Sequence, residues 1–336
     1  MKELILKVSE RQHLTREEAA LAMRTIMDGG ATDVQIAALL IGLRTKGEQV
    51  EELLGFVEVM REKSLKVSLD DADAVDMCGT GGDGTGTFNI STVASFVVAG
   101  TGVTVAKHGN RSISSTCGSA DLLKALGVNI DLSPDLAGEC INTVGIGFLF
   151  APLFHPAMKH AAKARSELGV KTLFNLLGPM TNPAGVRRQL VGAFSRDAAR
   201  KMAEVFSKLD PLRVLVIHSG DGLDEASLEA STTVYEIKST LGQGTMHLEP
   251  GLFGLGTVKR DSILGGSPNA NAQIALRILN GEKIPQRDIV LANAALGLLA
   301  AEKARTLLEG VRLAADSIDS GMALQKLDGL RTFSSR

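Results

Sequence analysis

The stretch that decides the fold is CGTGGDGTGTFNIST, residues 78–92. Glycine at this density lets the backbone take positive φ angles and come close to a ligand. Bare N–H groups, neighbouring hydroxyls and the start of a following helix together favour an anion. Short apolar runs at 74–77 and 93–99 flank the stretch, so a strand, a glycine loop and a helix follow in the order of a phosphate site. A flexible linker is the alternative for a Gly/Ser/Thr-rich segment, and this flanking context disfavours it.

The composition is that of a globular protein. The chain has 336 residues, enough for two domains or one large one, and it is 44% hydrophobic and 22% charged. Its net charge is −2, no block of Lys and Arg occurs, and there is no Trp and one Tyr. These features argue against a nucleic-acid partner, which needs a basic surface and often stacking aromatics.

Cysteines and apolar segments indicate the compartment. Cys78, Cys117 and Cys140 are odd in number and lack metal-ligand spacing, so we expect a reduced, cytoplasmic protein. Residues 1–14 are too charged for a signal peptide. The most apolar late segment, 289–301, is interrupted by Asn293 and is too short to span a bilayer. We therefore predict a buried helix there and no membrane association.

The first part of the chain, residues 1–64, has only helical patterns. Thr15 and Thr32 each begin a capping-box sequence before an apolar run, and a third helix is predicted from about Glu48 to Lys63. Short helices separated by glycines are typical of a small helical domain. The polar run 65–73 that follows is a candidate hinge.

From residue 74 onwards, short β-type runs alternate with helical segments. The runs are 103–106, 146–150, 189–194 and 213–218. This alternation predicts an α/β domain over 74–336 with a mostly parallel sheet, and a mostly helical tail from Asn269. Ligands of such sheets bind beyond the carboxyl ends of the strands, so the loops after these runs are the places to search.

The first such loop contains KHGNR, residues 107–111, directly after the run 103–106. Lys107 is a natural partner for a phosphate. A solvated turn, in which His108 and Arg111 have no special function, is the alternative. Ser119 precedes a helical run, where it could cap the helix or donate to a phosphate at the same helix start, and its residue type favours neither.

Two further groups follow later strands and helices. Asp224 and Glu225 are adjacent carboxylates after the run 213–218, and such a pair suits Mg²⁺ when substrate phosphates complete its shell. The alternative is that such a pair is simply solvated at the surface. We interpret the other carboxylate pair, Asp70 and Asp71 in the candidate hinge, in this way. Arg165 ends a helix, where a cation ordinarily serves the helix dipole. The segment LLGPMTNP, 176–183, is interpreted as a fixed turn or a second hinge strand.

These motifs together resemble the anthranilate phosphoribosyltransferase family. The stretches that carry the resemblance are GTGGDGTGTFNIST (79–92), KHGNRSISSTCGSADLLKALG (107–127), RSELGVKTLFNLLGPMTNP (165–183) and GLDEAS (222–227). They keep the family's order over nearly the whole chain. The resemblance implies a nucleoside phosphorylase/phosphoribosyltransferase-like fold, with a helical domain completed by a segment near 168–185 and a homodimer formed through that domain.

The resemblance also implies a set of site residues. Phosphoribosyl pyrophosphate (PRPP) would be held by Gly79, Gly82, Asp83, Thr87, Asn89, Ser91, Thr92, Lys107 and Ser119. Mg²⁺ would be bound by Ser91, Asp224 and Glu225, and anthranilate would contact Gly79, His108, Asn110 and Arg165, with Arg165 at its carboxylate. The sequence departs from the family in GGSPNANA, 265–272, where no implied ligand lies. Cys117 stands where serine is also usual and is interpreted as a small neutral filler.

The implied reaction replaces the pyrophosphate at ribose C1 with the amine nitrogen of anthranilate. Fixed N–H dipoles, Lys107 and Mg²⁺ would stabilise the departing pyrophosphate, and domain closure would bring the substrates together. An aromatic amine is neutral near pH 7, so a strong base is unnecessary; His108 is either a proton acceptor or a wall of the anthranilate site. The rival functions are a pyrimidine nucleoside phosphorylase, which KHGNR and the acidic pair disfavour, and a nucleic-acid-binding relative, which the net charge disfavours.

Overall fold

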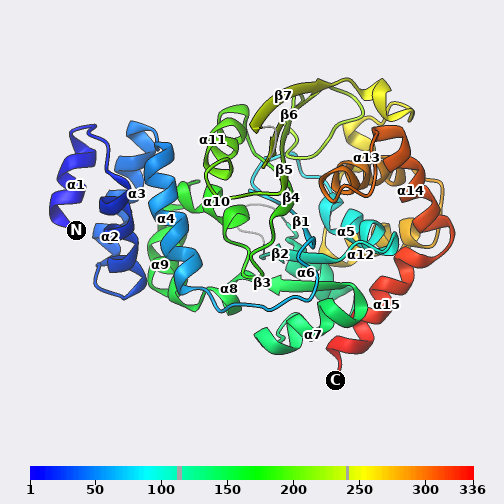
Figure 1. Cartoon of the computed structure of the whole chain (residues 1–336), viewed down its shortest axis with the longest axis horizontal. Helices are drawn as coiled ribbons and strands as arrows, with labels where there is room; N and C mark the ends of the chain where they lie inside the picture. The colour runs from blue at the N-terminus through cyan, green and yellow to red at the C-terminus, as the bar shows by residue number, and fades with distance from the viewer. Residues whose placement is uncertain (112–115, 240–241) are drawn as a thin grey trace.

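The computed structural model describes residues 1–111, 116–239 and 242–336. The chain begins with a bundle of helices, drawn in blue in Figure 1: α1 (Lys2–Ser9), α2 (Arg16–Met27), α3 (Asp33–Lys46) and α4 (Val50–Lys63). Both predicted capping boxes are present. Thr15 pairs with Glu18 at the start of α2, and Thr32 pairs with Gln35 at the start of α3. The three helices expected here are confirmed, and α1 precedes them.

Two later helices complete this bundle. Helix α9 (Lys159–Leu168) packs against α2 and α3, and α10 (Leu173–Leu177) packs against α3 and α4. Of the two alternatives for 176–183, the turn is confirmed and the hinge strand is not, because α10 ends at Leu177 and is followed by a 3₁₀ turn, Gly178–Thr181. The start of α10 is fixed by the Asn175 side chain, whose Oδ1 accepts a hydrogen bond from the Thr172 N–H at 3.1 Å.

The centre of the molecule is one seven-stranded sheet of order β3-β2-β1-β4-β5-β6-β7. The strands are β1 (Val75–Gly79), β2 (Val105–Gly109), β3 (Ile146–Phe150), β4 (Arg188–Gly192), β5 (Arg213–Ser219), β6 (Thr232–Lys238) and β7 (Gly242–Leu248). Strands β1 to β5 are parallel, as predicted. Strands β6 and β7 are antiparallel additions that the sequence analysis missed, because β7 is almost entirely exposed and its sequence is polar.

The sheet lies between two cores. On one side pack α5 (Ile90–Gly100), α6 (Ser119–Ala125), α7 (Pro134–Val144), α12 (Pro268–Leu279), α13 (Pro285–Ala300), α14 (Leu307–Asp319) and α15 (Met322–Ser334). On the other side lie α11 (Arg196–Phe206) and the helical bundle, as Figure 1 shows, while the short α8 (Ala151–Phe154) follows β3. Alternation along β1 sends Met77 into the first core and Cys78 into the second. Over the described residues, no helix has both the length and the apolar character needed to cross a membrane.

The end of strand β2 differs from prediction in a way that matters for the site. Strand β2 runs to Gly109, so Lys107 and His108 lie within the sheet and not in the loop after it; Lys107 is paired in register with Phe148 of β3. Successive strand residues face opposite sides of a sheet. Lys107 and His108 are therefore directed to opposite faces of the sheet, and both line the cleft at the strand ends.

Candidate active site

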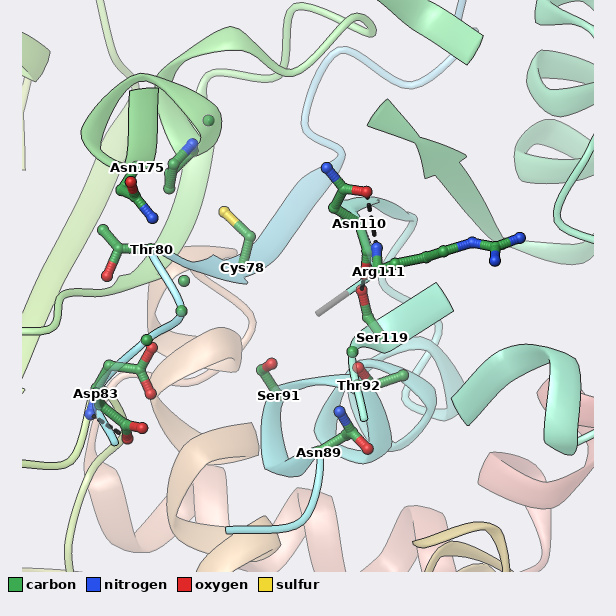
Figure 2. A pocket seen from close by; sticks show the side chains of 18 of the residues that line it. Cys78, Thr80, Asp83, Asn89, Ser91, Thr92, Asn110, Arg111, Ser119 and Asn175 are labelled. Carbon is green, nitrogen blue, oxygen red and sulfur yellow. Dashed lines mark hydrogen bonds between the residues drawn. The ribbon is translucent and has the colours of Figure 1, made fainter. Parts of the chain in front are cut away.

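One cleft at the carboxyl ends of the central strands gathers the predicted site residues. Its lining includes every one of them: Gly79, Gly82, Asp83, Thr87, Asn89, Ser91, Thr92, Lys107, His108, Asn110, Ser119, Arg165, Asp224 and Glu225. Figure 2 shows Asp83 on one side of the glycine loop, Ser91 and Thr92 at the start of α5, and Asn110 with Ser119 opposite. Parallel strands bring loops that are far apart in sequence to one edge.

The glycine loop turns through several positive φ angles. Gly81, Gly82, Gly84 and Gly86 have φ values of 62°, 72°, 75° and 73°, which residues with a side chain rarely adopt. Asp83 braces the loop from within, because its two carboxylate oxygens accept from the N–H (3.1 Å) and the hydroxyl (2.6 Å) of Thr85. The loop leads directly into the N-terminus of α5, where the positive end of the helix dipole favours an anion.

Three carboxyl groups meet beside this loop. The Asp224 N–H donates to Asp83 Oδ2 at 3.4 Å, and the Ser91 N–H donates to Glu225 Oε1 at 3.0 Å. Burial, with further contributions from Asp83 and Glu225, raises the pKa of Asp224 well above its ordinary value. Burial also raises the pKa of Glu225 to about 7, although Lys107 and the Ser91 N–H oppose the shift. Like charges held this close favour a bound cation.

The acidic group fits Mg²⁺ in its donor chemistry. Oxygen ligands are those that Mg²⁺ prefers, and it is commonly held by one or two carboxylates together with water and substrate phosphates. Among residues 1–111, 116–239 and 242–336, no group of three or more His, Cys, Asp and Glu side chains is placed to hold a metal ion by itself. Asp224 and Glu225, beside an anion-binding loop, therefore suit a metal that arrives with a phosphorylated substrate.

Two glycines allow Asp224 to lie at the strand ends. A Cβ on Gly192 would stand 1.7 Å from the Asp224 carbonyl oxygen, and a Cβ on Gly79 would stand 2.9 Å from Asp224 Oδ2. Any side chain at Gly192 would thus displace the backbone of the acidic segment. The cleft depends on this close approach of Asp224 to Gly192 and Gly79, which the spacing of residues in the sequence does not predict.

Lys107 and Asp76 are two buried ionisable side chains on the strands under the cleft. Lys107 donates to the Met77 carbonyl, and burial lowers the pKa of its ammonium group. Asp76 is fully buried on β1, and it accepts from the His108 N–H at 3.0 Å and from Asn182 Nδ2 at 2.8 Å. Burial raises the pKa of Asp76, while Lys107 opposes that rise. Asp76 was not among the predicted site residues, although a single acid inside an otherwise apolar strand was the available signal.

His108 points to the other side of the sheet, next to a second buried histidine. Its ring centroid is 5.3 Å from that of His155, and neither Nε2 atom has a hydrogen-bond partner among the described residues. Burial lowers the pKa of His108 to about 3 and that of His155 to about 4. Both imidazoles are neutral near pH 7 and are weak bases, so the environment of His108 favours a wall over a proton acceptor.

Arg165 and α10 form the far wall of the cleft. The Arg165 guanidinium lies over the Phe174 ring at 4.8 Å from its centroid, and burial lowers its pKa. No ion pair of Arg165 occurs within the described part of the chain. Asn175 also faces the cleft, near Thr80 in Figure 2, and was missed although it belongs to a quoted motif. Because no carboxylate of the described residues pairs with Arg165, its guanidinium is available to an anionic ligand.

The loop around Asn110 corrects one prediction. Gly118 and not Ser119 occupies the N-cap position of α6, because Ser119 is already the first helical residue. Its hydroxyl donates to the Asn110 carbonyl at 3.1 Å. Arg111 points away from the glycine loop in Figure 2 and lies 5.8 Å from the Phe150 ring centroid. Cys117 is buried, and burial raises the pKa of its thiol to about 11, so it is neutral as predicted.

Comparison with known proteins gives a consistent family. Residues 2–64 match the helical bundle domain of the glycosyl transferase family, and residues 71–324 match its a/b domain. A protein of Pelotomaculum thermopropionicum, an anthranilate phosphoribosyltransferase, is 51% identical over 334 residues, which cover 99% of this chain and 96% of that protein. A Symbiobacterium thermophilum protein of the same name is 49% identical, covering 100% of this chain and 98% of the relative.

Solved structures extend the likeness to three dimensions. The anthranilate phosphoribosyltransferase of Thermus thermophilus superposes with a TM-score of 0.93 at 42% identity, covering 99% of each chain. The enzyme of that name from Saccharomyces cerevisiae, solved with PRPP and Mg, superposes with a TM-score of 0.91 at 27% identity, covering 100% of this chain and 99% of the other.

Proposed function

The chain belongs to the anthranilate phosphoribosyltransferase family, and on that premise we propose which of its residues carry the reaction. The protein transfers the phosphoribosyl group of PRPP to the amine of anthranilate, giving N-(5-phosphoribosyl)anthranilate and pyrophosphate in tryptophan biosynthesis. Mg²⁺ is its cofactor. The observation that carries the assignment of residues is the meeting of an acidic group with an amide-lined glycine loop.

We propose that PRPP is held by the glycine loop and the start of α5. The supporting set lines the cleft and consists of Gly79, Gly82, Asp83, Thr87, Asn89, Ser91, Thr92, Lys107 and Ser119. Positive φ angles at Gly82 and its neighbours turn the backbone so that N–H groups of the loop would meet phosphate oxygens. Lys107 supplies a buried positive charge beneath the loop, where the charge of the leaving pyrophosphate develops.

We propose that Asp224, Glu225 and the Ser91 hydroxyl hold the metal. Held there, Mg²⁺ would supply positive charge to neutralise the departing pyrophosphate and so lower the barrier to cleavage at C1. The chain's own contribution is to keep two carboxylates at a fixed place: the Ser91 N–H holds Glu225, and Gly192 admits the Asp224 backbone. Deprotonation of Glu225, whose pKa is raised to about 7, is needed before it can serve as a ligand.

Anthranilate is proposed to lie between the Asn110 loop and α10, with Gly79 beneath it. Arg165, which has no carboxylate partner among the described residues, would bind the carboxylate of anthranilate. His108 would line this part of the cleft as a neutral imidazole. A neutral aromatic amine needs no strong base to attack, so positioning and leaving-group stabilisation would supply most of the catalysis, with inversion at an oxocarbenium-like C1.

We also propose the organisation of the chain around the cleft. A helical domain of residues 1–64, completed near 168–185, would move against the α/β domain 74–336 through the hinge 65–73. The hinge lies beside the segment that follows α10, because the Val67 N–H donates to the Pro183 carbonyl at 3.2 Å. Closure would exclude water from the activated ribose.

A homodimer through the helical domain is proposed as well. Exposed apolar side chains on α1 and α3 support it: Leu6 is 59% exposed, Val34 78% and Ile41 36%. Burial of such residues between two copies would release water from apolar surface. Light scattering of the Val34→Asp and Ile41→Asp double variant should give the monomer mass, and an unchanged dimer would exclude this face. We also propose a cytoplasmic location, which is supported by the lack of a disulfide at Cys78, Cys117 and Cys140 among the described residues.

One assay tests the function and its metal site together. The loss of anthranilate fluorescence is followed with PRPP and Mg²⁺, using the wild type and an Asp224→Asn, Glu225→Gln double variant. We expect turnover by the wild type and none by the double variant. Phosphorolysis of a pyrimidine nucleoside in place of anthranilate consumption would support the phosphorylase alternative, whereas full activity of the double variant would remove the metal assignment.

A further inference from the structure

Helix α13 carries a single amide in its buried centre. Asn293 is 0% exposed, as are its neighbours Ala292 and Ala294. An amide so deep costs stability unless its hydrogen bonds are made. Asn293 makes three of them: Nδ2 donates to the Ile289 carbonyl at 2.9 Å and to the Ala226 carbonyl at 3.1 Å, and Oδ1 accepts from the Ala226 N–H at 2.8 Å. Two of the three bonds thus hold one residue, 67 positions earlier in the chain.

Ala226 directly follows the proposed metal ligands. Because Asn293 holds both its N–H and its C=O, the peptide planes on either side of Ala226 are fixed. The preceding carbonyl, that of Glu225, accepts from the Ser219 hydroxyl at 2.6 Å. The backbone of Glu225 is therefore held from two sides, while its carboxylate accepts from the Ser91 N–H.

The helix that carries Asn293 is itself fixed to the site. Helix α13 packs along α5, whose first turn contains Ser91. The contact is close, because a Cβ on Gly297 would stand 3.1 Å from Cγ2 of Val98 on α5, and also 2.8 Å from the sulfur of Met77 on β1. Asn293 and Ser91 thus extend from one packed pair of helices toward the same acidic segment, and their separation cannot change without moving that pair.

We propose that Asn293 is a positioning residue that sets the place of Asp224 and Glu225 and thereby the Mg²⁺-dependent affinity for PRPP. The proposal rests on the assignment of the metal to those two carboxylates. It explains why an amide interrupts a helix that is otherwise apolar at its centre. A residue that served packing alone would affect folding stability without changing the dependence of PRPP binding on Mg²⁺.

The test measures PRPP binding by calorimetry, once with saturating Mg²⁺ and once with EDTA, so that turnover is not needed. Asn293→Leu keeps similar volume and removes all three bonds, whereas Asn293→Asp keeps the shape and the acceptor for the Ala226 N–H. Ser317→Ala is the matched control, because it removes another buried hydrogen bond, from the Ser317 hydroxyl to the Val97 carbonyl (2.7 Å), away from the acidic segment. Thermal unfolding shows which variants are folded.

We expect Asn293→Leu to reduce the gain in PRPP affinity that Mg²⁺ provides by roughly 10- to 100-fold, as losses of partners behind metal ligands do. Asn293→Asp should lose less, the affinity in EDTA and the KM for anthranilate should stay within about twofold, and Ser317→Ala should keep the wild-type gain. The proposal is overturned if a folded Asn293 variant keeps the full gain, or if Ser317→Ala loses as much. Should Asn293→Leu fail to fold, Asn293→Asp decides.

The Asp224→Asn, Glu225→Gln double variant separates this inference from the proposed function. If the double variant keeps the Mg²⁺-dependent gain, the assignment of the metal ligands fails. If it loses the gain while both Asn293 variants keep it, the metal site stands and only the positioning function of Asn293 fails.

Discussion

Replacing Glu225 with glutamine should stabilise the metal-free protein while it removes the Mg²⁺-dependent binding of PRPP. Burial raises the pKa of the Glu225 carboxyl from its ordinary value of 4.5 to about 7, so the folded protein pays a free-energy penalty for its ionised form. Glutamine has nearly the same shape and keeps an oxygen that can accept from the Ser91 N–H. Glutamine carries no charge, so it avoids the cost of burying an ionised carboxylate beside Asp83 and Asp224.

The size of the effect follows from the pKa. One pKa unit corresponds to about 1.4 kcal/mol, so a rise from 4.5 to about 7 sets an upper value of about 3.5 kcal/mol. The carboxyl is partly open to the cleft, and solvent screening reduces the expected gain to about 1–2 kcal/mol. Below pH 4.5 the group is protonated in both the folded and the unfolded state, and the variant gains nothing. Between pH 4.5 and 7 the unfolded state loses its proton first, and above about pH 7 the gain is complete.

The assay is urea unfolding in EDTA at pH 5 and pH 8, with Glu249→Gln as a control for the loss of an exposed carboxylate. The difference in unfolding free energy between Glu225→Gln and the wild type should be small at pH 5 and about 1–2 kcal/mol at pH 8. Glu249→Gln should change neither. A Glu225→Gln protein that is less stable than the wild type at pH 8, or equally changed at both pH values, would refute the reasoning.

Three further changes test other parts of the cleft. Arg165→Ala should raise the KM for anthranilate by roughly 10- to 100-fold through loss of a charged hydrogen bond while PRPP affinity is kept; steady-state kinetics and calorimetry check this, and equal losses for both substrates would contradict it. Gly192→Ala should destabilise the fold by about 1–3 kcal/mol and weaken Mg²⁺-dependent PRPP binding, because its Cβ would overlap the Asp224 carbonyl oxygen; unchanged PRPP affinity would be the contrary result. His108→Asn should leave the shape of the kcat/KM profile between pH 6 and 8 unaltered, since burial lowers the pKa of His108 to about 3; disappearance of an ionisation near pH 6.5 would show that the imidazole titrates there.

Local sequence determined much of this protein. The capping boxes at Thr15 and Thr32, the glycine loop and the parallel strands follow from short-range signals: side chains that cap a helix, glycines that take positive φ, and apolar runs of strand length. Loops after parallel strands meet at one edge, so residues chosen as separate strand-end groups line a single cleft. The name of the acceptor came from the resemblance to a family and not from these signals.

Tertiary structure alone decided how those groups act on one another. The pKa of Glu225 depends on burial and on Lys107, Ser91 and Asp83, which are far away in sequence. The position of Asp224 depends on the missing side chain of Gly192. In the sequence, Asn293 is only a polar interruption of an apolar segment, and its two hydrogen bonds to Ala226 are evident only in the folded protein. Strands β6 and β7 were missed for a related reason, because a polar strand is stabilised by its pairing with a neighbour and not by its own pattern. Electrostatics, close packing and strand pairing are properties of distances between remote residues, and those distances exist only once the chain has folded.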